Sequence, residues 1–287
     1  MLNLRCKCVR LFVRMSALVF AGCIGSAMAQ TSPQTAIPSP GMIGTDAQKG
    51  GGYSNWDVQL LYGNGFREPG NPNDVAKTTF TIENSSAWSW GSSYFFIDVL
   101  HSGSNDQYAW EGYGEWYPSA SLGKMTGKDL SFGILKDVSL TTGINAGRKS
   151  TGANPLVFLP GATFDLALPG FAFFSLGVYA YIDRGHIDNG ASNGCHATGV
   201  QVTPSWLLPF SIGSAKFQFD GFLDYISSHG ACVSQVLTQP RLTLDVGSLV
   251  GTPDKFYAGI EYQYWRDKFG ISGLKESFPE IMVMYRF

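Results

Sequence analysis

The chain has 287 residues, of which 14% are aromatic and only 15% are charged, against about 25% charged residues in ordinary soluble domains. Together with 35 glycines, this composition favours a β-rich membrane protein over a cytosolic enzyme. Lys and Arg total 20 against 22 Asp and Glu, a formal net charge of −2, so the chain lacks the basic excess typical of nucleic-acid-binding proteins.

Residues 1–29 have the pattern of an export signal. Four basic residues precede a short apolar run at 17–25, and the small residues at 27 and 29 predict cleavage before Gln30. A lipoprotein signal cut before Cys23 is the alternative, although Phe20 fits the first lipobox position poorly. Cleavage removes four basic residues and no acidic ones, so 16 Lys and Arg remain against 22 Asp and Glu, a net charge of −6.

The next segment, residues 30–52, is rich in Ser, Thr, Pro, Gln and Gly and predicts a flexible lead-in. From residue 53 to residue 287, runs of about ten alternating apolar and polar residues are separated by turn residues, as in transmembrane β-barrels. We predict an all-β fold, a twelve-stranded antiparallel transmembrane barrel. Its strands cover residues 53–66, 77–88, 92–102, 108–122, 129–145, 155–168, 171–183, 199–210, 215–227, 234–246, 256–267 and 280–287.

An even strand number places both termini on one side, the periplasm. The long loops at 67–76, 184–198 and 268–277 then lie outside the cell, whereas the stretch at 247–254 is longer than a periplasmic turn should be.

The closing strand, residues 280–287, alternates cleanly and ends on an aromatic residue. Ile281, Val283 and Tyr285 would face lipid, with Glu280 and Met282 on the opposite face. This strand must pair with the first one, because an open edge in a bilayer leaves backbone groups without hydrogen bonds.

A large exported sandwich would show the same alternation with the apolar faces turned inward, so periodicity alone does not choose between the two folds. Strand length and the terminal Phe favour the barrel. So do the tryptophans near strand ends, which we expect to form interfacial girdles: Trp56, Trp88, Trp90, Trp206 and Trp265.

In the barrel, the inward side chains mix aromatic rings with carboxylates. Rings can stack on a flat solute and carboxylates accept hydroxyl protons, so this mixture favours a flat, neutral, hydrogen-bonding solute. The alternative is structural packing of the lumen, with the charges paired. The candidate solute-binding residues are Tyr94, Phe96, Asp98, Glu111, Tyr113, Glu115, Tyr117, Phe171, Phe173, Tyr179, Tyr181, Asp220, Phe222, Asp224, Arg241 and Glu261, and the alternation also turns Asp183 and Asp245 inward.

Two of the five cysteines remain after cleavage of the signal. Cys195 and Cys232 fall in neighbouring outer loops, and a pair in an oxidising compartment predicts a disulfide. Two free thiols are an alternative. A metal site that combines His186, His196 and His229 with these thiols is another, although the spacing matches no zinc pattern.

We expect no enzyme activity and no cofactor, because metalloprotease and phosphate-loop signatures are absent. Glu111 and Glu115 would lie about 13 Å apart along one strand, too far for a retaining or inverting glycosidase pair.

Four segments resemble the Tsx nucleoside-specific channel-forming family of bacterial outer membranes: residues 115–119 (EWYPS), 128–133 (KDLSFG), 264–267 (YWRD) and 283–287 (VMYRF). The resemblance implies a monomeric twelve-stranded barrel in the outer membrane of a Gram-negative cell, with passive uptake of nucleosides and deoxynucleosides. It also implies outer loops used by phages and colicins.

The matching positions in these segments are Glu115, Asp129 and Trp265. Residues 184–198, with their cysteine, depart from the family, which leaves another small polar solute open. A plugged structural or receptor barrel without channel activity is the alternative function.

Overall fold

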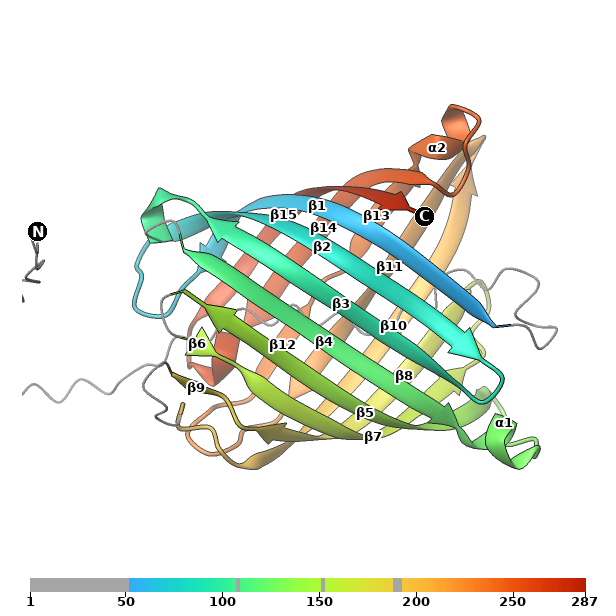
Figure 1. The fold of residues 1–287 in the computed structure, drawn as a ribbon, viewed down its shortest axis with the longest axis horizontal. Coiled ribbons are helices and arrows are strands. Elements are labelled where there is room, and N and C mark those ends of the chain that lie inside the picture. Colours follow the sequence, from blue (N-terminus) through green and yellow to red (C-terminus); the bar gives the residue numbers. More distant parts are fainter. Residues whose placement is uncertain (1–51, 107–108, 151–152, 188–192) are drawn as a thin grey trace, which may run out of the picture.

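The computed structural model describes residues 52–106, 109–150, 153–187 and 193–287, and the predicted signal over 1–29 and nearly all of the lead-in over 30–52 lie outside them. The chain winds into a single barrel of tilted antiparallel strands (Figure 1). The wall strands are β1 (Tyr53–Arg67), β2 (Asp74–Trp88), β3 (Gly91–Ser102), β4 (Trp110–Ser121), β5 (Leu135–Lys149), β7 (Leu156–Leu166), β8 (Phe173–Asp183), β10 (Thr198–Ile212), β11 (Ala215–Ile226), β12 (Gln235–Thr238) with β13 (Arg241–Asp245), β14 (Phe256–Arg266) and β15 (Lys275–Arg286).

The barrel is closed by its first and last strands. β1 pairs with β2 on one side and with β15 on the other, with Val58 opposite Tyr285 and Leu60 opposite Val283. The Phe287 N–H donates to the Trp56 carbonyl at 2.9 Å, which extends the pairing to the last residue. Because β12 and β13 both pair with β11 and β14, they form one interrupted wall strand, and the predicted twelve-stranded barrel is confirmed.

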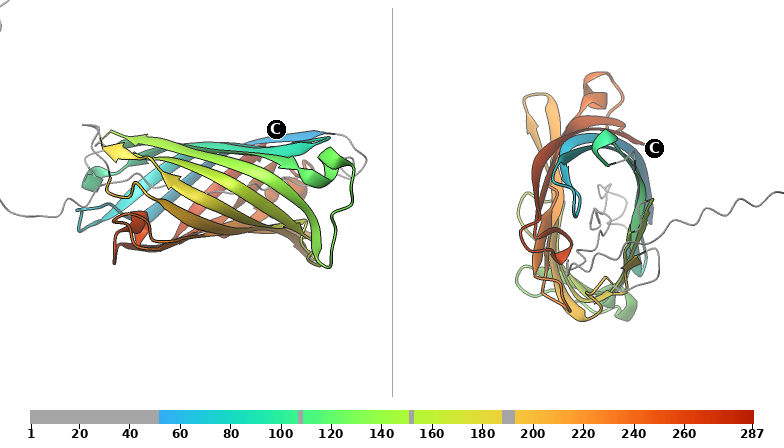
Figure 2. Two further views of the ribbon diagram at one scale, coloured as in Figure 1. Left: turned by 90° about the horizontal axis from the view of Figure 1, so that it is seen from below. Right: turned by 90° about the vertical axis from the view of Figure 1, so that its left-hand side faces the viewer.

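Short elements mark the two ends of the barrel (Figure 1). We call the end that carries the start of β1, the end of β15, α1 (Leu122–Thr126) and α2 (Val246–Leu249) the terminal end. The loop end carries β6 (Ala153–Asn154), β9 (His186–Ile187), η2 (Ser104–Asp106) and η3 (Lys268–Gly270). Seen along its length, the barrel is oval (Figure 2). Within the described residues, no helix has both the length and the apolar character needed to cross a membrane.

Side chains alternate between a buried inner face and an exposed outer face, as a strand period of two requires. On β15, Ile281 and Val283 are 67% and 40% exposed, whereas Glu280 and Met282 are 0% and 3% exposed. Leu60 and Ile97 project outward from β1 and β3 in the same way. The outer face is therefore apolar, and the charged and polar residues line the interior.

Most observed strand bounds lie within three residues of the predicted ones, but the closing strand begins at Lys275, five residues before its predicted start. Two other wall strands differ for local reasons. The strand predicted at 129–145 begins at Leu135, because Ser121 caps α1 by accepting from the Lys124 N–H at 3.0 Å and turns the chain away from the wall. The strand predicted at 234–246 is interrupted at Pro240, which has no N–H to donate to the ladder. Gly221 lies opposite this break with φ +149°, and a Cβ there would approach the Gln239 carbonyl oxygen to 2.7 Å.

The predicted tryptophan girdles are correct in part. Trp56 and Trp90 are exposed on the outer face, and so are Trp110 and Trp116, which were not among the predicted girdle residues. Trp265 was wrongly assigned to a girdle: it is 1% exposed, lies inside the barrel and donates its indole N–H to the Gln235 amide oxygen at 2.9 Å. Its place follows from β14, where the alternation turns Trp265 to the same side as Glu261 and Gln263.

Candidate solute-binding lumen

Fourteen of the sixteen predicted lumen residues are buried on the inner wall: Tyr94, Phe96, Asp98, Glu111, Tyr113, Glu115, Tyr117, Tyr179, Tyr181, Asp220, Phe222, Asp224, Arg241 and Glu261. Asp183 and Asp245 are buried as well. Phe173 begins β8 and is partly buried. Phe171 was wrongly placed on the inner wall. It lies in the turn before β8, where its ring packs 5.5 Å from that of Phe174, a residue that the alternation assigns to the outer face.

Four tyrosines from β4 and β8 form one side of the interior, which we call the tyrosine wall: Tyr113, Tyr117, Tyr179 and Tyr181. The strands between β4 and β8 offer glycines beneath the rings. A Cβ at Gly143 would lie 2.4 Å from Cε1 of Tyr117, and a Cβ at Gly147 would lie 2.8 Å from Cδ2 of Tyr113. The rings therefore lie over the neighbouring strands, and the centroids of Tyr117 and Tyr179 are only 6.2 Å apart.

Hydrogen bonds hold this wall in place. The Tyr113 hydroxyl donates to the Glu115 carboxylate at 2.5 Å. The Tyr179 hydroxyl ends a chain of hydroxyl contacts through Thr163, Thr141 and Ser119, with oxygen–oxygen distances of 2.9, 2.8 and 2.8 Å. These partners fix the orientations of the Tyr113 and Tyr179 rings, and all four rings are packed against neighbouring groups, with at most 7% of their surface exposed.

Charged residues occupy the opposite side, around Arg241. Its guanidinium contacts Asp220 at 2.5 and 2.7 Å, Glu83 at 3.6 Å and the Gln59 side-chain oxygen at 3.3 Å. Glu83 also accepts the Tyr94 hydroxyl at 3.0 Å, which links this cluster to β3. A cavity of about 20 Å³ adjoins these groups, enough for roughly one water molecule.

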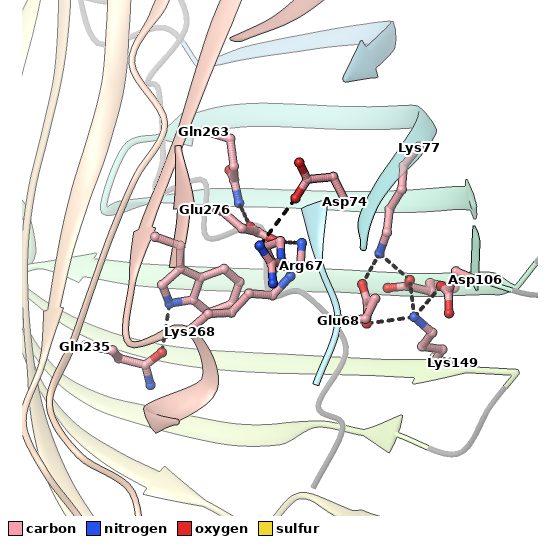
Figure 3. A network of polar contacts seen from close by, with 12 residues as sticks. Arg67, Glu68, Asp74, Lys77, Asp106, Lys149, Gln235, Gln263, Lys268 and Glu276 are labelled. Atoms are coloured by element: carbon pink, nitrogen blue, oxygen red, sulfur yellow. Dashed lines mark hydrogen bonds and ion pairs between the residues drawn. The ribbon is translucent and has the colours of Figure 1, made fainter. Parts of the chain in front are cut away.

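A buried ion network lies at the loop end, and we call it the loop-end network (Figure 3). The Lys77 ammonium contacts Glu68 at 2.6 Å and Glu111 at 2.5 Å. The Lys149 ammonium contacts Glu68 at 2.8 Å, Asp106 at 2.7 Å and Glu111 at 3.1 Å. The carboxylates of Glu68, Asp106 and Glu111 come within 4.8 Å of one another, and the two lysines supply the charge that holds them there.

Glu68 joins this network from the loop that follows β1. Burial on its own would raise the pKa of its carboxyl, but the ammonium groups of Lys77, Lys268 and Lys149 outweigh that effect and lower the pKa to about 2. Sequence reasoning did not single out Lys77 or Lys149. Strand alternation could have identified Lys77, because it lies on the same face of β2 as the inward Thr79 and Thr81.

The loop between β14 and β15 folds into the same end. The Lys268 ammonium is fully buried, contacts Glu276 and lies 5.2 and 4.7 Å from the ring centroids of Trp265 and Phe269. Gln263 donates to the other Glu276 oxygen at 2.8 Å (Figure 3). The segment is therefore packed against the inner wall.

The predicted disulfide between Cys195 and Cys232 is confirmed, with a Cα–Cα distance of 5.3 Å. It ties the loop before β10 to the loop after β11 at the loop end. The Val233 N–H donates to the Gly270 carbonyl at 2.9 Å, which links the loop after β14 to the same group. The alternative metal site is wrong for these cysteines, because their sulfurs bond to each other. The His196 and His229 rings bond to the carbonyls of Gly185 and Ser227.

One packed cluster joins the two sides of the interior. It consists of Tyr94, Phe96, Tyr113, Tyr117, Val157, Leu159, Tyr179, Tyr181, Phe222, Ile226, Leu237, Trp265 and Phe269. The cluster includes side chains from β3, β4, β7 and β8 together with others from β11, β12 and β14, so the bore is narrow at its level.

Of the three residues matched to the channel family, Glu115 and Trp265 lie inside the barrel. Asp129 lies in an exposed loop at the terminal end and accepts the Ser131 N–H at 2.8 Å. Residues 190–194 spell the Gly-x-Ser-x-Gly pattern of hydrolases, but that pattern needs a strand, a sharp turn and a helix. The described residues from 193 onward lead instead to strand β10.

No family model matches this chain, and no curated protein matches it. Among solved structures, the chain is similar to the KdgM porin, with 11% identity and a TM-score of 0.44 over 81% of this chain and 99% of that one. It is also similar to the translocator domain of the autotransporter NalP from Neisseria meningitidis, with 12% identity and a TM-score of 0.39 over 83% of this chain and 88% of that one.

Proposed function

We propose that this chain is a monomeric diffusion channel for small polar solutes in the outer membrane of a Gram-negative cell. The support is the combination of a closed barrel, an apolar outer face and an inner wall of aromatic and polar residues. An apolar face of this extent is rare on soluble monomers but suits hydrocarbon, and closure leaves no unpaired strand edge in the bilayer. The export signal that the sequence predicts over residues 1–29 agrees with that location.

We further propose that the solutes are nucleosides and deoxynucleosides. The observation that carries this step is the tyrosine wall, whose preformed rings adjoin the acceptors Glu115 and Asp224 and the hydroxyls of Thr163 and Thr141. A flat base can stack on such rings, and sugar hydroxyls can exchange hydrogen bonds with the polar groups. Weak, repeated contacts of this kind favour passage without trapping.

Liposome swelling tests both proposals at once. The full mature chain, reconstituted in liposomes, should admit nucleosides faster than sugars of matched size and faster than amino acids. Equal rates for all three solute classes would leave a general channel and remove the nucleoside proposal.

Two inward tyrosines allow a sharper test. Tyr113→Ala and Tyr179→Ala should reduce nucleoside flux more than ion conductance, because each removes stacking surface while widening the bore. Tyr262→Ala is the matched control, since Tyr262 projects from the outer face of β14 and is 41% exposed. Equal losses of flux in all three variants would point to misfolding rather than to lost solute contacts.

The linked loops at the loop end support a second candidate function. Three loops at the loop end are linked by the Cys195–Cys232 disulfide and by backbone hydrogen bonds, and Lys268 and Phe269 of the third loop are buried. We propose as the alternative a plugged structural or receptor barrel whose outer loops bind phages or colicins. Single-channel recordings without any conductance would favour this function over transport.

A further inference from the structure

Two carboxylates face each other directly on the inner wall. Glu261 of β14 and Glu280 of β15 are register partners in the antiparallel ladder, a position that brings Cβ atoms within about 4.5–5.5 Å. Both are inward, and they are 7% and 0% exposed. Like charges in directly opposed positions destabilise a sheet, and burial raises that cost, so the pair needs either a compensating positive charge or a shared proton.

The basic groups around the pair are engaged elsewhere. Arg241, the register partner of Glu261 on β13, contacts Asp220 at 2.5 Å. Lys77, two strands from Glu280 in the same ladder row, contacts Glu68 and Glu111 at 2.6 and 2.5 Å. These basic groups therefore attract the pair at a distance, but their direct contacts are with other carboxylates.

The contacts of the two carboxylates are unequal. Glu261 accepts one hydrogen bond, from the Gln239 amide at 2.9 Å. Neither carboxylate oxygen of Glu280 has a hydrogen-bond partner among the described residues, although both are buried. A Cβ at Gly63 would lie 2.7 Å from the Glu280 Cγ and 3.0 Å from its Oε2, so the side chain lies over the adjacent strand β1.

Two further buried oxygens lack a hydrogen-bond partner within the described residues, as the Glu280 oxygens do. The Gln263 side-chain oxygen and one Asp98 carboxylate oxygen are buried without a hydrogen-bond partner in the described part of the chain. The charge of Asp98 is close enough to act on Glu261 and on Glu280. Oxygen atoms that are preformed, buried and unpaired are the groups that a cation would satisfy.

The balance of buried charge points the same way. Among the described residues, thirteen buried carboxylates stand against four buried Lys and Arg side chains. The acidic set is Asp57, Glu68, Glu83, Asp98, Glu111, Glu115, Asp183, Asp220, Asp224, Asp245, Glu261, Glu276 and Glu280, and the basic set is Lys77, Lys149, Arg241 and Lys268.

We propose that Glu280 and Glu261 form a cation-binding site on the inner wall. It takes a small positive charge that fits between two carboxylates, either a monovalent inorganic ion or the ammonium group of a solute. The inference goes beyond passage of neutral solutes, because it assigns a ligand class and two residues to a part of the lumen distinct from the tyrosine wall.

Cation-dependent stability tests this site without any need for conductance. The full mature chain in zwitterionic detergent is unfolded thermally at pH 7.5 and constant ionic strength, while N-methylglucamine chloride is replaced by potassium chloride or by methylammonium chloride. When the concentration of a cation that binds exceeds its dissociation constant, each further tenfold rise in that concentration should raise the thermal unfolding midpoint by roughly 3–6 °C. Glu280→Gln and Glu261→Gln should abolish the rise, and Asp129→Asn, in an exposed loop, should keep it.

Each outcome decides something. A rise with potassium identifies an inorganic cation, and a rise with methylammonium identifies an ammonium ligand. A wild-type midpoint that ignores both salts, or a Glu280→Gln variant that keeps the full rise, overturns the proposal. A midpoint that depends on pH but not on the cation also overturns it, because the pair would then share a proton.

Ion selectivity provides the second test, and this one rests on the proposed channel. The zero-current potential across a potassium chloride gradient should show preference for potassium over chloride, and Glu280→Gln should lose that preference. Absence of all conductance would count against the channel and leave the stability result standing. A conducting wild-type barrel without cation preference would count against the site.

Discussion

The loop-end network and the Glu261–Glu280 pair both bury carboxylates on the inner wall, but only the network places ammonium groups in direct contact with its carboxylates. In the network, Lys77 and Lys149 lie within 3.1 Å of Glu111 and pair it with Glu68. In the pair, Glu280 has no hydrogen-bond partner among the described residues, and the nearest basic groups are bound to other carboxylates. A buried carboxylate with its own lysine joins strands to loops, whereas one without a partner is available to a ligand.

The largest expected effect comes from breaking the network. Lys77→Met leaves Glu68 and Glu111 buried with one fewer ammonium, and removing one partner of a buried ion pair typically costs about 3–5 kcal/mol. Denaturant unfolding of the reconstituted protein measures the loss. Lys124→Met is the matched control, because Lys124 is exposed in α1 and its substitution should change stability by no more than about 0.5 kcal/mol. Equal effects of the two substitutions would mean that the network does not stabilise the fold.

Acid should break the same network more gently. The folded pKa of Glu68 is about 2, against an ordinary value of 4.5. Because the folded pKa is the lower one, the stabilisation is fully present above about pH 4.5 and is lost as the pH falls toward 2. A shift of this size is worth about 3 kcal/mol. Unfolding midpoints between pH 6 and pH 2 should decline over this window in the wild type and decline less in Glu68→Gln.

A third prediction concerns the uncharged part of the inner wall, where glycines lie beneath the tyrosine rings. Gly143→Val places a side chain against the Tyr117 ring, where a Cβ alone would already approach to 2.4 Å. Overpacking of this type typically costs about 1–3 kcal/mol, and the displaced ring should also slow nucleoside flux. Gly112→Val is the control, since a Cβ at Gly112 meets nothing within 4 Å. Indistinguishable variants would mean that the tyrosine wall adapts freely.

The smallest effect is expected outside the barrel. Asp129→Ala alters an exposed loop at the terminal end, where the side chain accepts only the Ser131 N–H among its hydrogen bonds within the described residues. Nucleoside flux and ion selectivity should therefore equal those of the wild type in liposome and bilayer assays. A reduced flux would show that this loop, one of the segments resembling the channel family, takes part in transport.

Strand alternation accounts for most of what could be predicted from the sequence. It turned Tyr113, Tyr179 and Glu280 inward and Ile281 outward, because a side-chain period of two holds wherever a strand is regular. The same rule would have placed Trp265 inside had it been applied from Glu261 onward. The preference of tryptophan for interfaces competed with that parity, and on β14 the register prevailed.

Irregular backbone was the part that local patterns could not resolve. The break at Pro240 depends on Gly221 in the adjacent strand, and the fold of the loop after Arg266 depends on contacts of Lys268 with Trp265 and Glu276. Both features therefore depend on residues from other strands. In the same way, no spacing rule connects Lys149 to Glu68, which are 81 positions apart in the sequence.

From its own pattern of residues, the chain determined where its strands lie, which face of each strand is apolar and which side chains share the opposite face, since these follow from alternation along one strand. Only the tertiary structure showed that the strands close into a barrel with the apolar faces outward, because a sandwich would have the same alternation. Only the closed structure decided which charges meet, because contacts across a barrel depend on register and strand tilt summed over many strands. Lys77 therefore has Glu68 and Glu111 as partners, whereas Glu280 lies opposite Glu261, a carboxylate of the same charge.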